Sequence, residues 1–137
     1  MKVVIDANRI FASLLKDNTS RKILFNTQFQ FFAPECIKEE VKKYNKELEK
    51  KMGITEKDIE IILKLFFERI NIIPKEQYEK QTVFLEKMLT DKNDIPYLAL
   101  AIKIKAKGIW THDSHFRKQR EVRIFTNIDL LREEIGY

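Results

Sequence analysis

Four acidic residues, far apart in the chain, lie in patterns that a structural role alone explains poorly. Asp6 ends the apolar run "KVVID", and Asp113 lies in "IWTHDSH", directly after a second apolar run. Glu40 and Asp94 lie in "PECIKEEVKKYNKEL" and "DKNDIPYLAL", which have helical spacing. Each alone is compatible with an ordinary turn, capping or ion-pairing role. Their chemical meaning depends on whether the fold brings them together.

The spacing around Glu40 places it at the edge of a buried helix face. The apolar residues of that face recur at helical intervals, at Ile37, Val41, Tyr44 and Leu48. Glu40 follows Ile37 by three positions and precedes Tyr44 by four, so it borders the face. Its neighbour Glu39 points roughly 100° further round the helix, and we expect it in solvent. Pairing of Glu40 with a nearby Lys at the core boundary is an equally good interpretation.

Asp94 lies at the start of a helix that we expect to be buried. Pro96 belongs to the first helical turn, which predicts Asn93 as the N-cap and Asp94 just inside it. An acid in the first turn complements the helix dipole, which is a sufficient structural reason for it. Asp94 also shares a face with Leu98 and Ala101, on a helix whose opening is apolar nearly all round. That surrounding favours a functional role.

Strand and helix patterns alternate along the 137 residues. The predicted strands are 2–6, 29–34, 70–74, 108–111 and 122–125. The predicted helices are 9–16, 20–28, 35–52, 56–70, 76–89, 94–107 (ended by Gly108) and 128–135. This alternation predicts one domain over residues 1–137, a three-layer α/β/α sandwich with a mainly parallel sheet of about five strands. In such folds ligands bind beyond the carboxyl ends of the strands, so Asp6 and Asp113 meet if their strands are neighbours.

Convergence of the four acids would create a site that needs cations. Unpaired carboxylates in a small volume either become protonated or bind positive charge. An all-oxygen cluster suits Mg²⁺ or Mn²⁺, which can activate water and orient a phosphodiester. The chain has 26 Lys and Arg against 21 Asp and Glu, a net charge of +5, and this suits a polyanionic partner. Together these features favour a metal-dependent nuclease.

Other chemistries fit the residues less well. His112 and His115 suggest a transition-metal site, but the chain has 2 His in all, and their spacing is poor for zinc. Asp6 suggests a phosphoaspartate hydrolase, but the general acid expected two residues later is replaced by Asn8. A lone Cys36 excludes an internal disulfide framework. No apolar run approaches the ~20 residues that span a bilayer, and the N-terminus lacks a signal-peptide pattern, so we expect a cytoplasmic protein without membrane contact.

Four segments, in this order, resemble the PIN-domain family, the small metal-dependent ribonuclease fold of VapC-like toxins and RNA-processing enzymes. They are "VVIDAN", "PECIKEEV", "DKNDIPYLALAIKIKAKGIWTHD" and "VRIFT". The resemblance places the family's acidic residues on Asp6, Glu40, Asp94 and Asp113, and its polar positions on Asn8 and Thr111. It implies Mg²⁺ or Mn²⁺ dependence and cleavage of single-stranded RNA that leaves a 5′-phosphate. One departure is the helical pair over 35–70, which is longer than in the most compact toxins.

Two functions remain open at this stage. The favoured one is a metal-dependent endoribonuclease, either free-standing or the toxin of a toxin–antitoxin pair, with an antitoxin protein as partner. The alternative is a non-catalytic RNA-binding or assembly module on the same fold, which would gain nothing from four acids beside RNA. We expect a homodimer, and RNA contacts from Asn8, Thr111, Ser114 and Lys46. A wider RNA groove would have Lys42, Lys43, Lys46, Lys50 and Lys51 on one wall, and Arg117, Lys118 and Arg120 opposite.

Overall fold

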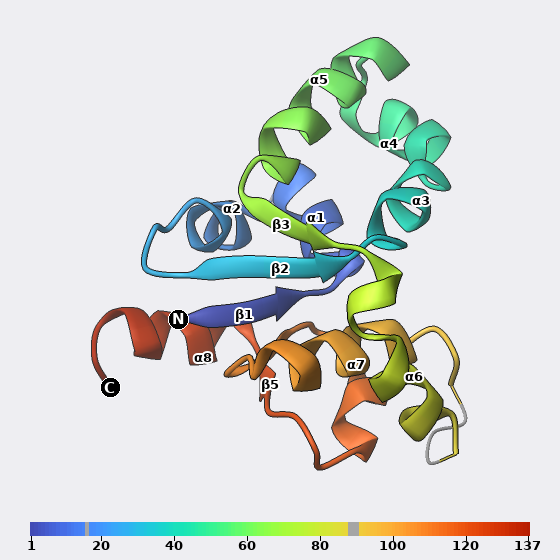
Figure 1. Cartoon of the computed structure of the whole chain (residues 1–137). Coiled ribbons are helices and arrows are strands. Elements are labelled where there is room, and N and C mark those ends of the chain that lie inside the picture. Colours follow the sequence, from blue (N-terminus) through green and yellow to red (C-terminus); the bar gives the residue numbers. More distant parts are fainter. Residues whose placement is uncertain (16, 88–90) are drawn as a thin grey trace.

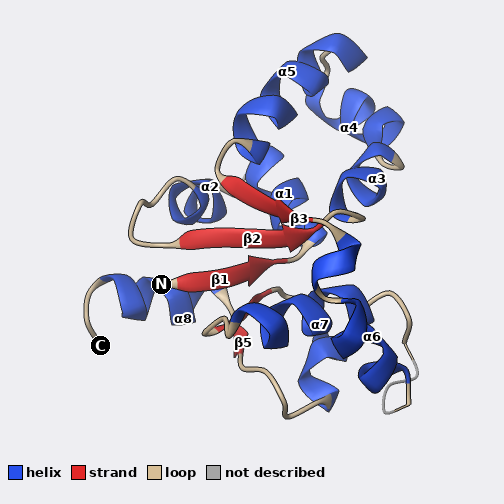
Figure 2. Cartoon of the chain, viewed as in Figure 1, coloured by secondary structure: helices blue, strands red, loops and turns tan. Residues whose placement is uncertain are grey.

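A computed structural model describes residues 1–15, 17–87 and 91–137, and within them five strands form one parallel sheet (Figures 1 and 2). The strands are β1 (Lys2–Ile5), β2 (Gln30–Pro34), β3 (Ile70–Ile73), β4 (Gly108–Trp110) and β5 (Ile124–Phe125). Their order is β3-β2-β1-β4-β5, and each neighbouring pair is parallel. The predicted α/β fold with a parallel sheet of about five strands is confirmed.

The helices cover both faces of this sheet. They are α1 (Ala7–Leu14), α2 (Asn18–Leu24), α3 (Ile37–Lys42), α4 (Asn45–Met52), α5 (Glu56–Phe67), α6 (Glu79–Glu86), α7 (Ile95–Ile104) and α8 (Asn127–Glu134), with short 3₁₀ turns η1 (Lys75–Gln77) and η2 (Ser114–Lys118). α7 packs across β1, β2 and β4, and α6 lies against α7. Right-handed crossovers place α1 and α2 on the opposite face, where α8 packs against α2. Figure 1 shows α4 and α5 rising beyond the sheet.

β1 is the central strand, and its sequence explains its position. Val3, Val4 and Ile5 are fully buried, as expected of a parallel strand that is covered on both faces. The prediction that Gly108 ends the preceding helix is wrong. α7 already ends at its C-cap Lys105, which has the left-handed conformation (φ 54°). Gly108 instead begins β4, where an added Cβ would lie 2.5 Å from the backbone oxygen of Arg123. Its missing side chain therefore lets the chain before β5 approach β4.

The predicted continuous helix over 35–52 is wrong in its middle. α3 ends at Lys42 and α4 begins at Asn45, with Tyr44 as the N-cap of α4. Because the helical phase is interrupted there, helical spacing does not determine which way a residue at the break itself points. Tyr44, predicted on the buried face, is 48% exposed. The other three predicted members of that face are buried: Ile37, Val41 and Leu48.

Several other helix ends also differ from the prediction. α2 begins at Asn18, before the predicted start at residue 20, because Asp17 caps this helix by accepting a hydrogen bond from the backbone N–H of Ser20. The helix predicted over 76–89 is divided into η1 and α6, and its residues 88 and 89 lie outside the described part of the chain. Residue 16, predicted at the end of the first helix, also lies outside it. None of the helices in the described ranges is both long and apolar enough to cross a membrane.

Candidate functional site

The strand order reverses between β1 and β4, and the two strands are hydrogen-bonded neighbours. From β1 the chain moves to β2 and β3 on one side, and then crosses to β4 and β5 on the other. Asp6 directly follows β1, and its backbone N–H donates to the carbonyl of Trp110, the last residue of β4. A reversal of this kind opens a crevice beyond the carboxyl ends of the strands, the end toward which the arrows of Figure 1 point.

A cavity of about 340 Å³ lies at this edge of the sheet, and all four predicted acids line it. They come from four different places: the end of β1, the middle of α3, the start of α7 and the loop after β4. Its full lining is Asp6, Ala7, Asn8, Phe11, Glu40, Lys43, Tyr44, Asn93, Asp94, Tyr97, Asp113 and Phe116. We call it the acidic cavity.

Asp6 is the most buried of the four acids, at 8% exposure. The Thr111 hydroxyl donates a 2.7 Å hydrogen bond to Asp6 Oδ2. Burial raises the pKa of Asp6 to about 6, against the opposing effect of that hydrogen bond, and the charge of Glu40 raises it further. Asp6 is therefore a carboxylate whose ionised form is poorly compensated by the protein itself.

Thr111 is 1% exposed and does not line the acidic cavity. Its hydroxyl accepts hydrogen bonds from the Asn8 side-chain amide at 3.3 Å and from the Asp113 backbone N–H at 3.0 Å. The hydroxyl thus links both strand ends beneath the acids. This geometry suits positioning of Asp6 better than the substrate contact predicted for Thr111.

Asp113 lines the acidic cavity, whereas the next residue, Ser114, does not. Asp113 Oδ1 accepts hydrogen bonds from the backbone N–H of His115 at 3.0 Å and lies 3.0 Å from its Nδ1. Ser114, predicted to contact substrate, is exposed and does not line the acidic cavity. His115 Nδ1 faces Asp113, so it is oriented by an acid of the cavity.

The N-cap of α7 is Asp94. The prediction of Asn93 as the N-cap is therefore wrong by one residue. Pro96 therefore occupies the second helical position, which tolerates Pro because its missing N–H needs no partner there. The Asp94 side chain makes no capping hydrogen bond, so the helix does not use its carboxylate. Burial raises the pKa of Asp94 to about 6, and the negative charges of Asp91 and Asp113 add to this.

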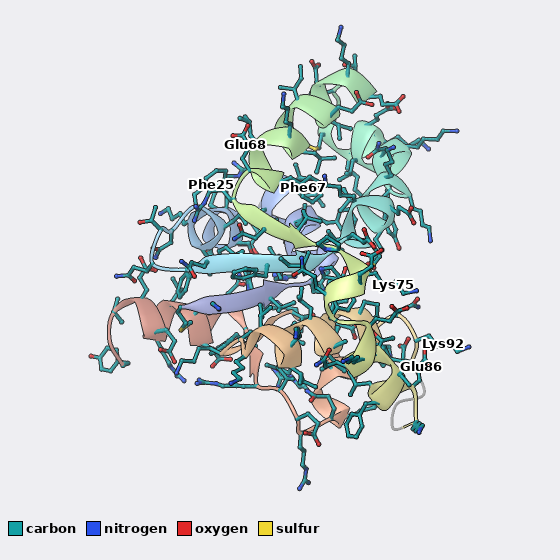
Figure 3. The ribbon with its side chains drawn as sticks, in the orientation of Figure 1. Phe25, Phe67, Glu68, Lys75, Glu86 and Lys92 are labelled. Atoms are coloured by element: carbon teal, nitrogen blue, oxygen red, sulfur yellow. The ribbon has the colours of Figure 1, made fainter. Side chains whose placement is uncertain are left out.

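Glu40 and Glu39 point to different cavities. Burial raises the pKa of Glu40 within the acidic cavity. Glu39 is exposed and lines a neighbouring cavity together with Lys75, Glu86 and Lys92, which lie on the side of η1 and α6 in Figure 3. Glu39 is thus in solvent as predicted, and it points in a different direction from Glu40.

Tyr97 was not predicted as a site residue. It is 1% exposed, and its hydroxyl is buried at the acidic cavity without a hydrogen bond of ordinary geometry among the described residues. The hydroxyl nevertheless lies near enough to Glu40 to lower the pKa of that carboxyl. Burial raises the pKa of Tyr97 far above its usual range, and the charges of Glu40 and Asp6 raise it further. A signal was present in the sequence, because Tyr97 follows Asp94 by three positions and so shares its helix face.

The basic residues do not form the predicted single wall. Lys43 lines the acidic cavity, whereas Lys42 lines a different cavity between α3 and α5. Lys51 lines a third cavity, and its ammonium lies 2.9 Å from Glu47. Because the helix is broken between α3 and α4, these lysines point in different directions. Other predicted RNA-contacting residues are exposed but line none of the cavities described here: Lys46, Lys50, Arg117, Lys118 and Arg120.

Arg9 was also missed, and it fixes the orientation of Asn8. Its buried guanidinium donates from Nε to Asn8 Oδ1 at 3.1 Å and from a terminal nitrogen to Ser20 Oγ at 3.4 Å, and it lies 4.0 Å from Asp17. Because Arg can only donate hydrogen bonds, it holds the Asn8 oxygen toward itself. The Asn8 amide nitrogen is left to donate to Thr111.

Asn127 ties this network to α8. Its amide nitrogen donates to Ser20 Oγ at 3.0 Å, and its oxygen accepts a 2.8 Å hydrogen bond from Trp110 Nε1. Its backbone N–H donates to Nε2 of His112 at 3.2 Å. Burial, and then the charge of Arg9, lower the pKa of His112. Because Nε2 of His112 already accepts this bond, that nitrogen is not free to bind a metal ion.

The donor set of the acidic cavity fits a hard cation, although the acids are not gathered closely. In the part of the chain that the structure describes, no three His, Cys, Asp or Glu residues lie close enough to hold a metal ion. The cavity nevertheless presents carboxylate oxygens and the unpartnered Tyr97 hydroxyl, and oxygen ligands are those that Mg²⁺ and Mn²⁺ prefer. Cys36 contributes no soft ligand, because it does not line the acidic cavity; burial, and then the charge of Glu40, raise its pKa to about 12.

A family model described as the PIN domain matches residues 4–126, and the chain belongs to this family. PIN domains are in general nucleases that use divalent metal ions. The resemblance inferred from the four segments is thus confirmed.

Two solved structures share the fold at low sequence identity. One is described as a toxin-antitoxin complex from Klebsiella pneumoniae (TM-score 0.66, 14% identity, covering 91% of this chain and 97% of that one). The other is VapBC2 from Rickettsia felis bound to a DNA fragment from their promoter (TM-score 0.64, 15% identity, covering 92% and 98%). No curated protein matches the chain.

Proposed function

We propose that this protein is a metal-dependent endoribonuclease that hydrolyses phosphodiester bonds of single-stranded RNA. The observation that carries the proposal is the acidic cavity, which acids from four separate parts of the chain line at the reversal of strand order. Among the described residues, no Lys or Arg forms an ion pair with any of the four. Acids without such partners in one cavity either become protonated or bind an external cation, and a divalent ion can satisfy several of them together.

Asp6, Glu40, Asp94 and Asp113 would hold Mg²⁺ or Mn²⁺, the ions expected from the family and from the oxygen donors. A bound ion would supply activation of water and stabilisation of the charge that develops on the phosphate. Thr111 orients Asp6 through its 2.7 Å hydrogen bond. Lys43, at the cavity wall, offers the positive charge that attracts a backbone phosphate, and Asn8 offers an amide fixed by Arg9.

The two solved relatives are toxin–antitoxin proteins by their descriptions, and this supports a narrower proposal. The chain would be the toxin of such a pair, acting in the cytoplasm as a homodimer and held inactive by an antitoxin protein. The long helical region from α3 to α5 leaves a free-standing nuclease as the other form of the same proposal. Inspection of the neighbouring reading frame for a small antitoxin-like protein separates the two.

The decisive test compares Glu40→Gln with Glu39→Gln. These adjacent residues have the same chemistry, but they line different cavities, so Glu39→Gln controls for charge and for helix stability. Cleavage of single-stranded RNA is measured with Mn²⁺ or Mg²⁺ and with EDTA. We expect Glu40→Gln to lose most turnover, Glu39→Gln to retain it, and EDTA to abolish it.

Three results would contradict the proposal. Equal losses in both variants would indicate a structural effect. Cleavage that persists in EDTA would indicate a contaminant or another chemistry. RNA binding without cleavage under any metal would identify the non-catalytic RNA-binding module instead.

A further inference from the structure

A second hollow of about 300 Å³ continues from the acidic cavity along α1 and α4. Its lining includes Asn8, Phe11 and Tyr44, which also line the acidic cavity, and it extends to Leu15, Glu47, Leu48 and Lys51. The two hollows therefore adjoin along these shared residues, and we call the pair of hollows the groove. Any polymer that is cut at the acids and follows this groove passes over the shared residues.

Phe11 and Tyr44 form a rigid aromatic pair at the junction of the two hollows. Their ring centroids are 4.9 Å apart at an interplanar angle of 66°, an edge-to-face arrangement that is among the favoured geometries for aromatic pairs. Phe11 packs against the hydrophobic core, whereas Tyr44 is 48% exposed. Tyr44 is also fixed at its backbone, where its N–H donates to Val41 and its carbonyl accepts from Leu48. The exposed ring is thus held in place before any ligand arrives.

We propose that Tyr44, braced by Phe11, is the stacking platform for a nucleobase next to the scissile phosphate of single-stranded RNA; this inference rests on the proposed nuclease function. Aromatic rings in grooves bind unpaired bases by stacking, whatever the base, because every base has a π-face. Of the large apolar side chains that are exposed in the described residues, Tyr44 alone lines the acidic cavity. It is therefore the side chain positioned to hold a base beside the acids.

The charges around the pair fit a nucleic-acid strand. Lys43 lies on the acidic-cavity side of Tyr44 and Lys51 in the second hollow. The two lysines flank the aromatic pair along the groove, so each can face a backbone phosphate while the base between them stacks. Lys51 is paired with Glu47 in the free protein, with side chains that are more than half exposed, and an exposed pair of this kind is weak enough to exchange for phosphate.

The test uses Tyr44→Leu, which keeps an apolar side chain but removes the π-face, and Tyr44→Phe, which keeps the ring. Phe84→Leu is the matched control, because Phe84 is an exposed aromatic residue on α6 that lines a different cavity. RNA affinity is measured in EDTA by fluorescence anisotropy, with a single-stranded oligoribonucleotide and with a series carrying one abasic position. Steady-state cleavage, Mn²⁺ affinity, thermal unfolding and molar mass in solution are measured alongside.

We expect Tyr44→Leu to weaken RNA binding by roughly tenfold, to raise KM with kcat largely retained, and to leave Mn²⁺ affinity unchanged. Tyr44→Phe and Phe84→Leu should bind RNA like the parent protein. Within the abasic series, the RNA that lacks the stacked base should bind the parent protein as weakly as intact RNA binds Tyr44→Leu. The same RNA should bind Tyr44→Leu no more weakly than intact RNA does.

Full affinity of Tyr44→Leu, or equal losses on every abasic RNA, would overturn the platform while cleavage by the parent protein still supported the nuclease. Tyr44-dependent binding without cleavage under any metal would support the platform and overturn the nuclease. Unchanged RNA affinity together with a lower molar mass in Tyr44→Leu would assign this surface to a second copy of the chain. Absence of any RNA binding by the parent would overturn both proposals.

Discussion

The hydroxyl of Thr111 donates to Asp6 Oδ2 at 2.7 Å, across 105 positions of sequence, and joins the ends of the two central strands. The same oxygen accepts from the Asn8 amide and the Asp113 backbone. Thr111 contributes no atom to the lining of the acidic cavity, yet it contacts two of its acids and a third polar residue. Its effect on the site is therefore testable by removing the hydroxyl alone.

Thr111→Val should lower both stability and metal affinity. The substitution keeps the shape but leaves buried hydrogen-bonding groups without a partner, which costs roughly 1–3 kcal/mol. Denaturant unfolding and Mn²⁺ titration calorimetry measure the two effects. Thr111→Ser retains the hydroxyl and should retain most of the Mn²⁺ affinity; equal Mn²⁺ affinity in Thr111→Val and the parent protein would show that Asp6 needs no positioning.

Asp94 and Asp17 are both helix N-caps, and their replacement by Ala should have opposite consequences. Asp17 accepts a capping bond from Ser20, and the Ser20 hydroxyl contributes most to lowering its pKa, so Asp17→Ala should cost about 1 kcal/mol. Asp94 makes no capping bond and has a raised pKa, so Asp94→Ala should leave the metal-free protein no less stable. The free energies of unfolding in EDTA decide this. A clear loss in Asp94→Ala would show that its carboxylate stabilises the fold.

The stability gained by Asp6→Asn should depend on pH. The pKa of Asp6 is raised from 3.8 to about 6 in the folded protein, so the folded state binds this proton more tightly than the unfolded state. Ionisation of Asp6 therefore opposes folding above pH 6, and this effect disappears as the pH falls through the window from about 6 to about 4. Without metal, Tm of Asp6→Asn should exceed that of the parent at pH 7.5, and the two should converge near pH 4. A difference in Tm between Asp6→Asn and the parent that widens as the pH falls would contradict this prediction.

Tyr97→Phe should leave the metal-free protein at least as stable as the parent. The hydroxyl is buried without a partner, and removing an unsatisfied polar group recovers up to roughly 1–3 kcal/mol of desolvation cost. The same variant should bind Mn²⁺ more weakly, because the hydroxyl lies near enough to Glu40 to lower the pKa of that carboxyl and its loss removes a polar neighbour of that ligand. Denaturant unfolding and calorimetry on one preparation separate the two. A loss of stability would mean that the hydroxyl is satisfied, for example by a buried water molecule.

The fold, and the placement of the four acids at one edge of the sheet, could be predicted from the sequence because both depend on local patterns. The run around Val3 is apolar and β-branched, as buried parallel strands are, and Asp6 and Asp113 follow such runs directly. Glu40 was placed correctly because its position was counted within α3. Tyr44 was misplaced because the same count was carried across the break at residues 43–44, where no Gly or Pro marks the end of the helix.

The contacts beneath the acids could not be predicted. Asn8 meets Thr111 across 103 positions, and Asn127 meets Ser20 across 107. No periodicity relates residues that far apart, and polar residues of these types are ordinary in turns and caps. Arg9 is likewise the first residue of a predicted helix, and no local pattern relates it to Ser20 and Asp17, beside which it lies in the structure.

The amide of Asn127 has a consequence for where the chain can be shortened. The family match ends at residue 126, and Asn127 is the first residue beyond it. A protein cut after Thr126 would keep every acid of the cavity and all five strands. It would lose the acceptor for Trp110 Nε1 and the donor to Ser20 Oγ. These two hydrogen bonds connect β4 to α2, and Ser20 is also the residue that accepts from Arg9. The last helix of this chain is therefore part of the support of the acidic cavity, and a truncated protein that lacks it would be a poor substitute for the whole one.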